Sequence, residues 1–330
     1  MKNIYLLDSN FKTIALLDDY SRLSWRRRYY DCGGFELICG KKGFAQAESA
    51  AYILLSGHDE LGIIDSFKLT DSGGELSGVF ATQLLNERVM YPMVKLKGNA
   101  ELLLREQVKS RLGVALRPII GREPFPLNLD TQLTGGTLLE WAQGLCRSNG
   151  WGCELGFNQA SRRLEFYVFK GEDRRRGNGE REAVILSSQW GTAKDCELDF
   201  TQQELKNIAI VAGEDLGALR KHITVDIRAG DEPARELWVD ARDLQQRYGM
   251  SDSEYYALLE KRGREKLAKH AIQLEFKCGG TQKLEFGLGD LINLKLGSFF
   301  GECRAVGFDE TFTKTECEVK ALFGEVKLVG

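Results

Sequence analysis

Residues 285–296 read EFGLGDLINLKL, and this stretch decides how the C-terminal part of the chain is expected to fold. From Ile292 to Leu296 an apolar side chain recurs at every second position, which is typical of a half-buried β-strand. Gly289 and Asp290 interrupt the pattern just before this strand. Glycine permits a backbone turn and aspartate accepts hydrogen bonds from nearby N–H groups, so the pair predicts a structural turn without catalytic function.

Most of the chain on either side also predicts β-strands. Residues 4–17 read as a hairpin with its turn at residues 8–10, and alternating segments continue to about residue 85. After residue 271 the chain again predicts strands to its end. The predicted fold class is therefore α+β, mostly antiparallel β, with β-rich halves that flank an α/β insert.

Three segments carry the signals of helices. Residues 98–113 have an apolar face, a capping Asn99 and a terminating Gly113. Residues 135–150 have a second apolar stripe. Residues 251–270 begin with a capping box of serine and glutamate. These helices divide the predicted chain into an N-terminal β domain at 1–97, an α/β insert at 98–182, and a C-terminal β-rich domain at 183–330 with the long helix.

The composition is that of a folded, mildly acidic protein. The 330 residues include 45 basic and 48 acidic side chains, for a net charge of −3. A protein that grips nucleic acid needs an excess of cations, so we expect no specific nucleic-acid binding. No run approaches the ~20 apolar residues of a membrane span, and no signal peptide precedes the first strands. We therefore expect synthesis and folding in the cytoplasm, with the 8 cysteines reduced.

No residue pattern indicates catalysis, a cofactor or a metal ion. The 3 histidines form no known ligand or triad spacing, and no phosphate-binding loop is present. Two carboxylate pairs, Asp240 with Asp243 and Glu172 with Asp173, have the residue types of a glycosidase site. Capping, turn and ion-pair roles explain the same carboxylates, so we expect no enzyme and keep a hydrolase as an alternative.

Two arginine triplets are the strongest candidates for contacts with other subunits. The first comprises Arg26, Arg27 and Arg28 and the second Arg174, Arg175 and Arg176. Solvated strand faces explain most such runs. Because arginine is enriched in protein interfaces, we also treat the six residues as possible subunit contacts.

Several stretches together resemble one protein family. They are LDDYSRLSWRRRYYDCGGFELIC, AYILLSGHDELGIIDSFKL, GNAELLLREQVKSRL, FYVFKGEDRR, RELWVDARDL and EFGLGDLINL followed by CRAVGFDETF. In this order and spacing they resemble the siphovirus-type phage tail proteins, which are related to the hub of tail tips and baseplates. The resemblance runs along nearly the whole chain, although no single motif is specific.

This resemblance implies a structural protein of the virion tail. It implies β-barrel-like hub domains and a homotrimeric ring that closes the tail tube and lets DNA pass at ejection. The expected partners are further copies of the chain, a distal tail or tail-tube protein, the tape-measure protein, and a fibre or spike protein. Two alternatives stay open: the hub of a contractile injection system or tailocin, and a cell-wall hydrolase associated with a tail. We expect no appended lytic domain.

Overall fold

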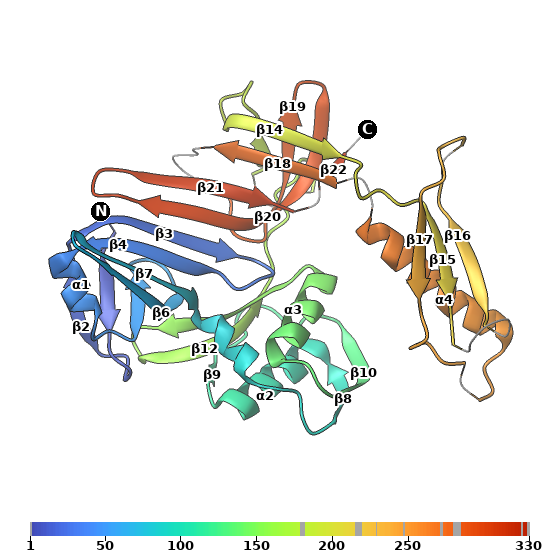
Figure 1. Ribbon diagram of the computed structural model, residues 1–330, viewed down its shortest axis with the longest axis horizontal. Helices are drawn as coiled ribbons and strands as arrows, with labels where there is room; N and C mark the ends of the chain where they lie inside the picture. Colours follow the sequence, from blue (N-terminus) through green and yellow to red (C-terminus); the bar gives the residue numbers. More distant parts are fainter. Residues whose placement is uncertain are drawn as a thin grey trace. The chain divides into compact units, whose positions relative to one another are not determined.

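The computed structural model describes residues 2–178, 182–214, 220–228, 230–246, 248–270, 273–279, 285–324 and 326–328 (Figure 1). The chain forms two compact units. Unit 1 comprises Met1–Glu197 and Phe276–Gly330, and unit 2 comprises Leu198–Glu275. These units cut the chain at other positions than the three predicted domains, because the predicted N-terminal domain, the predicted insert and both ends of the predicted C-terminal domain lie together in unit 1.

A sheet of 14 strands dominates unit 1. Its strands in spatial order are β14 (Lys194–Thr201), β18 (Gln273–Gly279), β21 (Cys317–Phe323), β20 (Phe299–Phe312), β3 (Tyr20–Arg28), β4 (Gly34–Gly40), β7 (Gly73–Phe80), β6 (Leu61–Thr70), β5 (Tyr52–Leu55), β1 (Ile4–Leu7) and β2 (Thr13–Leu17). Strands β13 (Ile185–Leu186), β19 (Leu291–Leu296) and β22 (Lys327–Leu328) complete it beside β20. Short helix α1 (Lys41–Ala47) packs against its N-terminal strands.

The pairing of β20 with β3 joins the two ends of the chain. Phe308 lies opposite Arg27, Glu310 opposite Trp25 and Phe312 opposite Leu23 in an antiparallel register. Directly opposite residues share one face of a sheet, so this pairing brings charged residues of distant segments onto the same face. The N-terminal core beneath these strands is apolar. In it the Trp25 ring contacts the rings of Phe35 and Phe80 in tilted arrangements.

A second core in unit 1 forms around the helices. It holds α2 (Ala100–Leu112), α3 (Leu138–Asn149) and the 3₁₀ helix η1 (Ala81–Glu87) against β11 (Gly152–Asn158) and β12 (Arg163–Phe169). Short strand β9 (Ala115–Leu116) runs parallel to β12, while β8 (Val94–Asn99) and β10 (Asn128–Leu133) pair by themselves. Helices α2 and α3 confirm the helices predicted at 98–113 and 135–150. As predicted, the Asn99 side chain caps α2, and Gly113 ends it with a φ of 68°.

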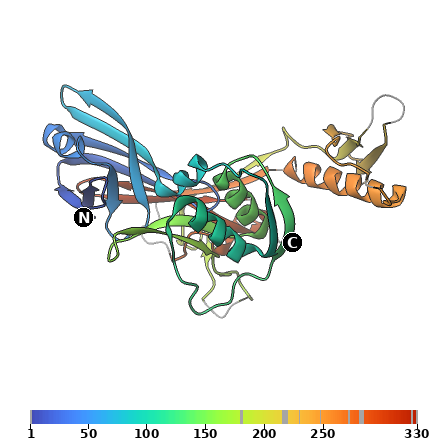
Figure 2. The same ribbon diagram turned by 90° about the horizontal axis from the view of Figure 1, so that it is seen from below.

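Unit 2 is a small sheet with one helix. Its strand order is β16 (His222–Asp226), β15 (Ile208–Ala212) and β17 (Glu236–Asp240). Helix α4 (Asp252–Lys269) lies along these strands, as Figure 2 shows in orange. The predicted capping box of Ser251 and Glu254 is present at its N-terminus.

The predicted α+β class with mostly antiparallel strands is confirmed. Among the strand pairs of the described residues, only β9 with β12, β13 with β19, and β15 with β17 are parallel. The main path of the long sheet ends at β14 and β2, and its branch beside β20 ends at β13 and β22. The described strands therefore form an open sheet and close no barrel. No helix in the described part of the chain is long and apolar enough to cross a membrane.

Candidate functional site

The predicted turn at Gly289 and Asp290 is a hydrogen-bonded junction between two segments of unit 1. Asp290 is 5% exposed. Its Oδ1 accepts a hydrogen bond from the backbone N–H of Glu172 at 2.7 Å, and its Oδ2 accepts one from the N–H of Gly287 at 2.7 Å. The aspartate thus satisfies two backbone donors and ties the chain after β12 to the strand that the turn precedes.

Gly289 is required at this junction for two reasons. Its φ is +93°, which side chains rarely tolerate, and an added Cβ would lie 2.3 Å from Cε2 of Tyr29. The Tyr29 hydroxyl donates to the carbonyl of Gly150 at 2.9 Å and accepts from the N–H of Gly171 at 3.2 Å. Burial raises the pKa of Tyr29 to about 12, so this hydroxyl stays protonated. The geometry agrees with the predicted architectural role of the turn.

The first arginine triplet is engaged within the chain. Arg26 forms an ion pair with Glu36 at 2.6 Å, and Arg28 forms one with Asp309 at 2.7 Å. Arg27 points to the opposite side of β3, where its Nε donates to Glu60. These contacts fix the arginines onto β4, the turn before β6, and β20 of the same chain, so a subunit contact for them stays a prediction.

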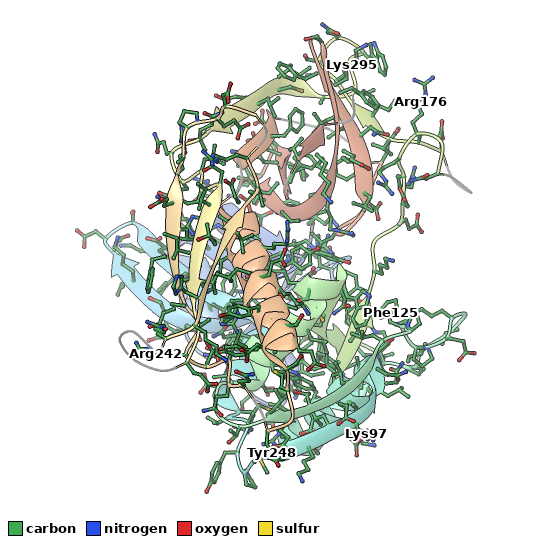
Figure 3. The ribbon with its side chains drawn as sticks, turned by 90° about the vertical axis from the view of Figure 1, so that its right-hand side faces the viewer. Lys97, Phe125, Arg176, Arg242, Tyr248 and Lys295 are labelled. Atoms are coloured by element: carbon green, nitrogen blue, oxygen red, sulfur yellow. The ribbon has the colours of Figure 1, made fainter. Side chains whose placement is uncertain are left out.

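The second triplet is also mostly engaged. Arg174 donates to the carbonyl of Glu182 at 2.7 Å, and Arg175 pairs with Asp173 at 2.6 Å and contacts Glu302. The N–H of Arg176 donates to Oδ1 of Asn293, but its exposed side chain projects away from the ribbon (Figure 3). Of the six arginines, Arg176 is therefore the one whose guanidinium is presented most openly to another molecule.

The best-defined cluster of ionisable groups is a buried ring that sequence reasoning missed. The buried ring consists of Arg27, His58, Glu60 and Glu310. His58 Nδ1 lies 3.5 Å from Glu60 Oε2, His58 Nε2 lies 3.3 Å from Glu310 Oε2, and Arg27 Nη1 lies 3.8 Å from Glu310 Oε1. His58, Glu60 and Glu310 are 8%, 4% and 8% exposed. Two cations alternate with two anions, so the ring is neutral when His58 is protonated.

The charges in the buried ring stabilise one another. Burial alone would raise the pKa of Glu60, but His58 and Arg27 outweigh burial and hold this pKa at about 2. Burial alone would lower the pKa of His58, but Glu310 and Glu60 outweigh it and raise this pKa. The opposing charges therefore favour the charged forms of His58 and Glu60, and the ring links β3, the turn before β6, and β20.

Glu154 on β11 lies beside the buried ring, but its pKa is shifted in the opposite direction to that of Glu60. Burial, followed by the negative charge of Glu60, raises the pKa of Glu154 to about 8, against the attraction of Arg27. Its Oε1 is buried without a hydrogen-bond partner among the described residues. A cavity of about 10 Å³ lined by Arg27, Glu60 and Glu154 has room for one water molecule.

A carboxyl of raised pKa beside one of lowered pKa also occurs in hydrolase active sites. Here the adjoining cavity is far smaller than the 300–1,000 Å³ that small-molecule sites typically enclose. The predicted carboxylate pairs do not form such a site either, since Asp240 pairs with Arg242, Asp243 with Arg262, and Asp173 with Arg175. No cluster of three or more histidine, cysteine or acidic side chains in the described residues can hold a metal ion.

The family comparison decides what kind of protein this architecture belongs to. The profile of the siphovirus ReqiPepy6 Gp37-like proteins matches residues 3–300. The chain belongs to this family. A comparison with the curated proteins gives no match.

Solved structures with the same fold include tail proteins and a chain of the PdpA–VgrG complex. The tail protein of Neisseria meningitidis MC58 has a TM-score of 0.62 and 13% identity, covering 98% of this chain and 96% of that one. The 43 kDa tail protein of prophage MuSo2 from Shewanella oneidensis has a TM-score of 0.60 and 11% identity, covering 98% of both chains. A chain of the half-lidded Francisella PdpA–VgrG complex has a TM-score of 0.53 and 8% identity, covering 99% of this chain and 57% of that one.

The resemblance seen in the sequence is confirmed by these findings. The chain is a component of a siphovirus-type phage or prophage tail, and its location is the virion tail. The buried ring and the Gly289 junction are then internal ties of a tail protein.

Proposed function

We propose that the chain is the hub subunit of a tail tip or baseplate, and that three copies form a ring that closes the tail tube. The observation that carries the proposal is the shared fold along almost the full length of two tail proteins. The open sheet supports it, because end strands β2 and β14 leave backbone groups that an adjacent subunit can cover. Pairing of unlike edges in a head-to-tail manner generates closed rings.

In this role the ring joins the distal tail or tail-tube protein on one side to a fibre or spike protein on the other. The tape-measure protein lies within the tube, and DNA passes through the ring at ejection. The near balance of 45 basic and 48 acidic residues supports passage without retention of DNA. The proposed role is architectural and needs no catalysis, which agrees with the paired state of the carboxylates described above.

The test is the mass and symmetry of the chain alone and in the particle. Light scattering should give a mass three times the 37.1 kDa of one chain, and electron cryomicroscopy of the tail should show a threefold ring at its tip. A monomer that never joins tail particles would contradict the hub role. Release of fragments from peptidoglycan by the pure protein would instead favour the hydrolase.

One alternative has an observation in its favour. The chain of the PdpA–VgrG complex shares the fold at a TM-score of 0.53, so a hub of a contractile injection system or tailocin has the same architecture available. A contractile sheath around the particle that contains this chain would support that alternative over a non-contractile tail.

A further inference from the structure

Helix α4 covers one face of the sheet of unit 2, and no other helix among the described residues of this unit covers the opposite face. Helix α4 packs Tyr255 and Leu259 against Val211 and its neighbours on one side of the strands. On the other side, Ile210 of the central strand lies between Thr224 of β16 and Trp238 of β17. Trp238 is 60% exposed, although tryptophan is usually among the more buried side chains. An exposed tryptophan on the sheet face away from α4 points to a binding surface.

A rigid polar group lies beside Trp238. Asp240 follows it by two positions on β17, so both side chains are on the same face. Arg220 donates to Asp240 Oδ1 at 2.6 Å, and Arg242 donates to Asp240 Oδ2 at 2.6 Å. The Arg220 guanidinium carbon lies 5.6 Å from the centre of the Trp238 ring. We refer to Trp238, Arg220, Asp240 and Arg242 as the Trp238 face.

The Trp238 face is organised before any ligand arrives. Arg220 also donates to the backbone carbonyls of Gly213 at 2.9 Å and Ala212 at 3.0 Å, and it is only 18% exposed. Asp240 receives Arg242 through two nitrogens, which fixes the carboxylate plane. Side chains that are already held in place lose little conformational entropy when they bind.

We propose that the Trp238 face binds a neutral carbohydrate. The indole ring offers a flat apolar surface that matches the C–H face of a pyranose, as aromatic side chains do for other flat apolar groups. Sugar hydroxyls both donate and accept hydrogen bonds. Glu236, exposed and two positions before Trp238 on β17, supplies acceptor oxygens. Arg242 has more N–H groups than Asp240 uses and supplies donors, so adjacent hydroxyls of one sugar find both kinds of partner within one site.

The balance of charge on this face favours a neutral ligand. Asp240 and its two arginines together leave one positive charge, and Asp226 at the other end of the face pairs with Arg228 at 2.7 Å. Glu236 adds a further carboxylate on the same face, opposite Ile208. Nucleic acid and sulfated glycans need an excess of cations, which these paired groups do not offer.

The test uses the full-length chain on an array of neutral, sulfated and sialylated oligosaccharides, with single-stranded DNA as a further probe. We expect binding to neutral glycans. Trp238→Ala should lower that signal by about tenfold or more, as for an aromatic residue at the centre of an interface, and Trp238→Phe should retain part of it. Phe299→Ala is the matched control, because Phe299 is 50% exposed and lies in unit 1.

A second readout does not depend on a variant. Trp238 is the only tryptophan between residues 198 and 275, so its fluorescence reports on this face once the other four are replaced by phenylalanine. Titration with the neutral glycan bound on the array should shift and quench this signal. Absence of any neutral glycan among the bound probes, binding confined to sulfated glycans or DNA, or an unchanged signal in Trp238→Ala with wild-type circular dichroism would each overturn the proposal. None of these results bears on the proposed role in the tail.

Discussion

Replacement of Glu154 by glutamine should make the protein more stable at alkaline pH. The Glu154 carboxyl has a pKa of about 8 in the folded chain, against 4.5 in an unfolded one. A raised carboxyl pKa means that its contribution to stability is complete below pH 4.5 and is lost as the pH rises through 8. At pH 7 the loss relative to pH 4.5 is on the order of 3 kcal/mol. Glutamine has the shape of the protonated carboxyl and removes this loss.

Loss of the proton of His58 in the buried ring also lowers the stability of the protein as the pH rises. Its pKa is raised, so its contribution is complete below its unfolded value of 6.5 and is lost as the pH rises through the folded value. Glu60, with a pKa of about 2, acts in the opposite direction and loses its contribution as the pH falls from 4.5 to 2. Taken together, these three groups place the maximum stability of the wild-type chain near pH 4.5, with a decline toward both lower and higher pH.

The assay is urea denaturation of unit 1 between pH 5 and 9. Trp238→Phe in every protein removes the tryptophan of unit 2, so the fluorescence of the other four reports on unit 1. We expect the unfolding free energy to decline with pH in the parent and to decline less in Glu154→Gln. Glu318→Gln, an exposed glutamate on β21, is the control. An unchanged slope in Glu154→Gln, or lower stability than the parent at pH 8, would refute the reasoning.

Three further substitutions test the ties described above. Asp290→Ala leaves the N–H groups of Glu172 and Gly287 without their acceptor and should lower the unfolding free energy of unit 1 by about 2 kcal/mol in the same urea assay. Gly289→Ala should lower it by at least ~2 kcal/mol, because of the positive φ and the clash with Tyr29; equal stability would contradict the required glycine. Ser251→Ala removes the cap of α4 and should cost about 1 kcal/mol, measured by hydrogen exchange in that helix, while exchange in α2 stays unchanged.

Features that depend on neighbouring residues could be predicted from the sequence. The caps of α2 and α4 are local hydrogen bonds. Asn99 and Gly113 therefore indicate from the sequence where α2 begins and ends, and Ser251 indicates where α4 begins. The hairpin of β1 and β2 was predictable for the same reason, since Asp8 accepts from the N–H of Asn10 within the turn itself.

Features that depend on distant pairing could not be predicted. The buried ring joins Arg27, His58, Glu60 and Glu310, which come from both ends of the chain, and neither their types nor their spacing identifies them as a cluster. Only the register of β20 with β3 places Glu310 and Arg27 on one face. The limits of unit 2 were not predicted, because they fall within β14 and β18, two strands of the large sheet whose pairing links segments far apart in the sequence.

The way unit 2 enters the chain has a consequence for how such proteins diversify. The chain leaves unit 1 after Glu197 and returns at Phe276, and the strands that bear these two points, β14 and β18, are neighbours in the sheet. An inserted domain whose two ends lie close together can be exchanged without a change in the fold of the domain that carries it. Recombination between tail genes can therefore replace unit 2 at this position while the sheet of unit 1 is inherited unchanged.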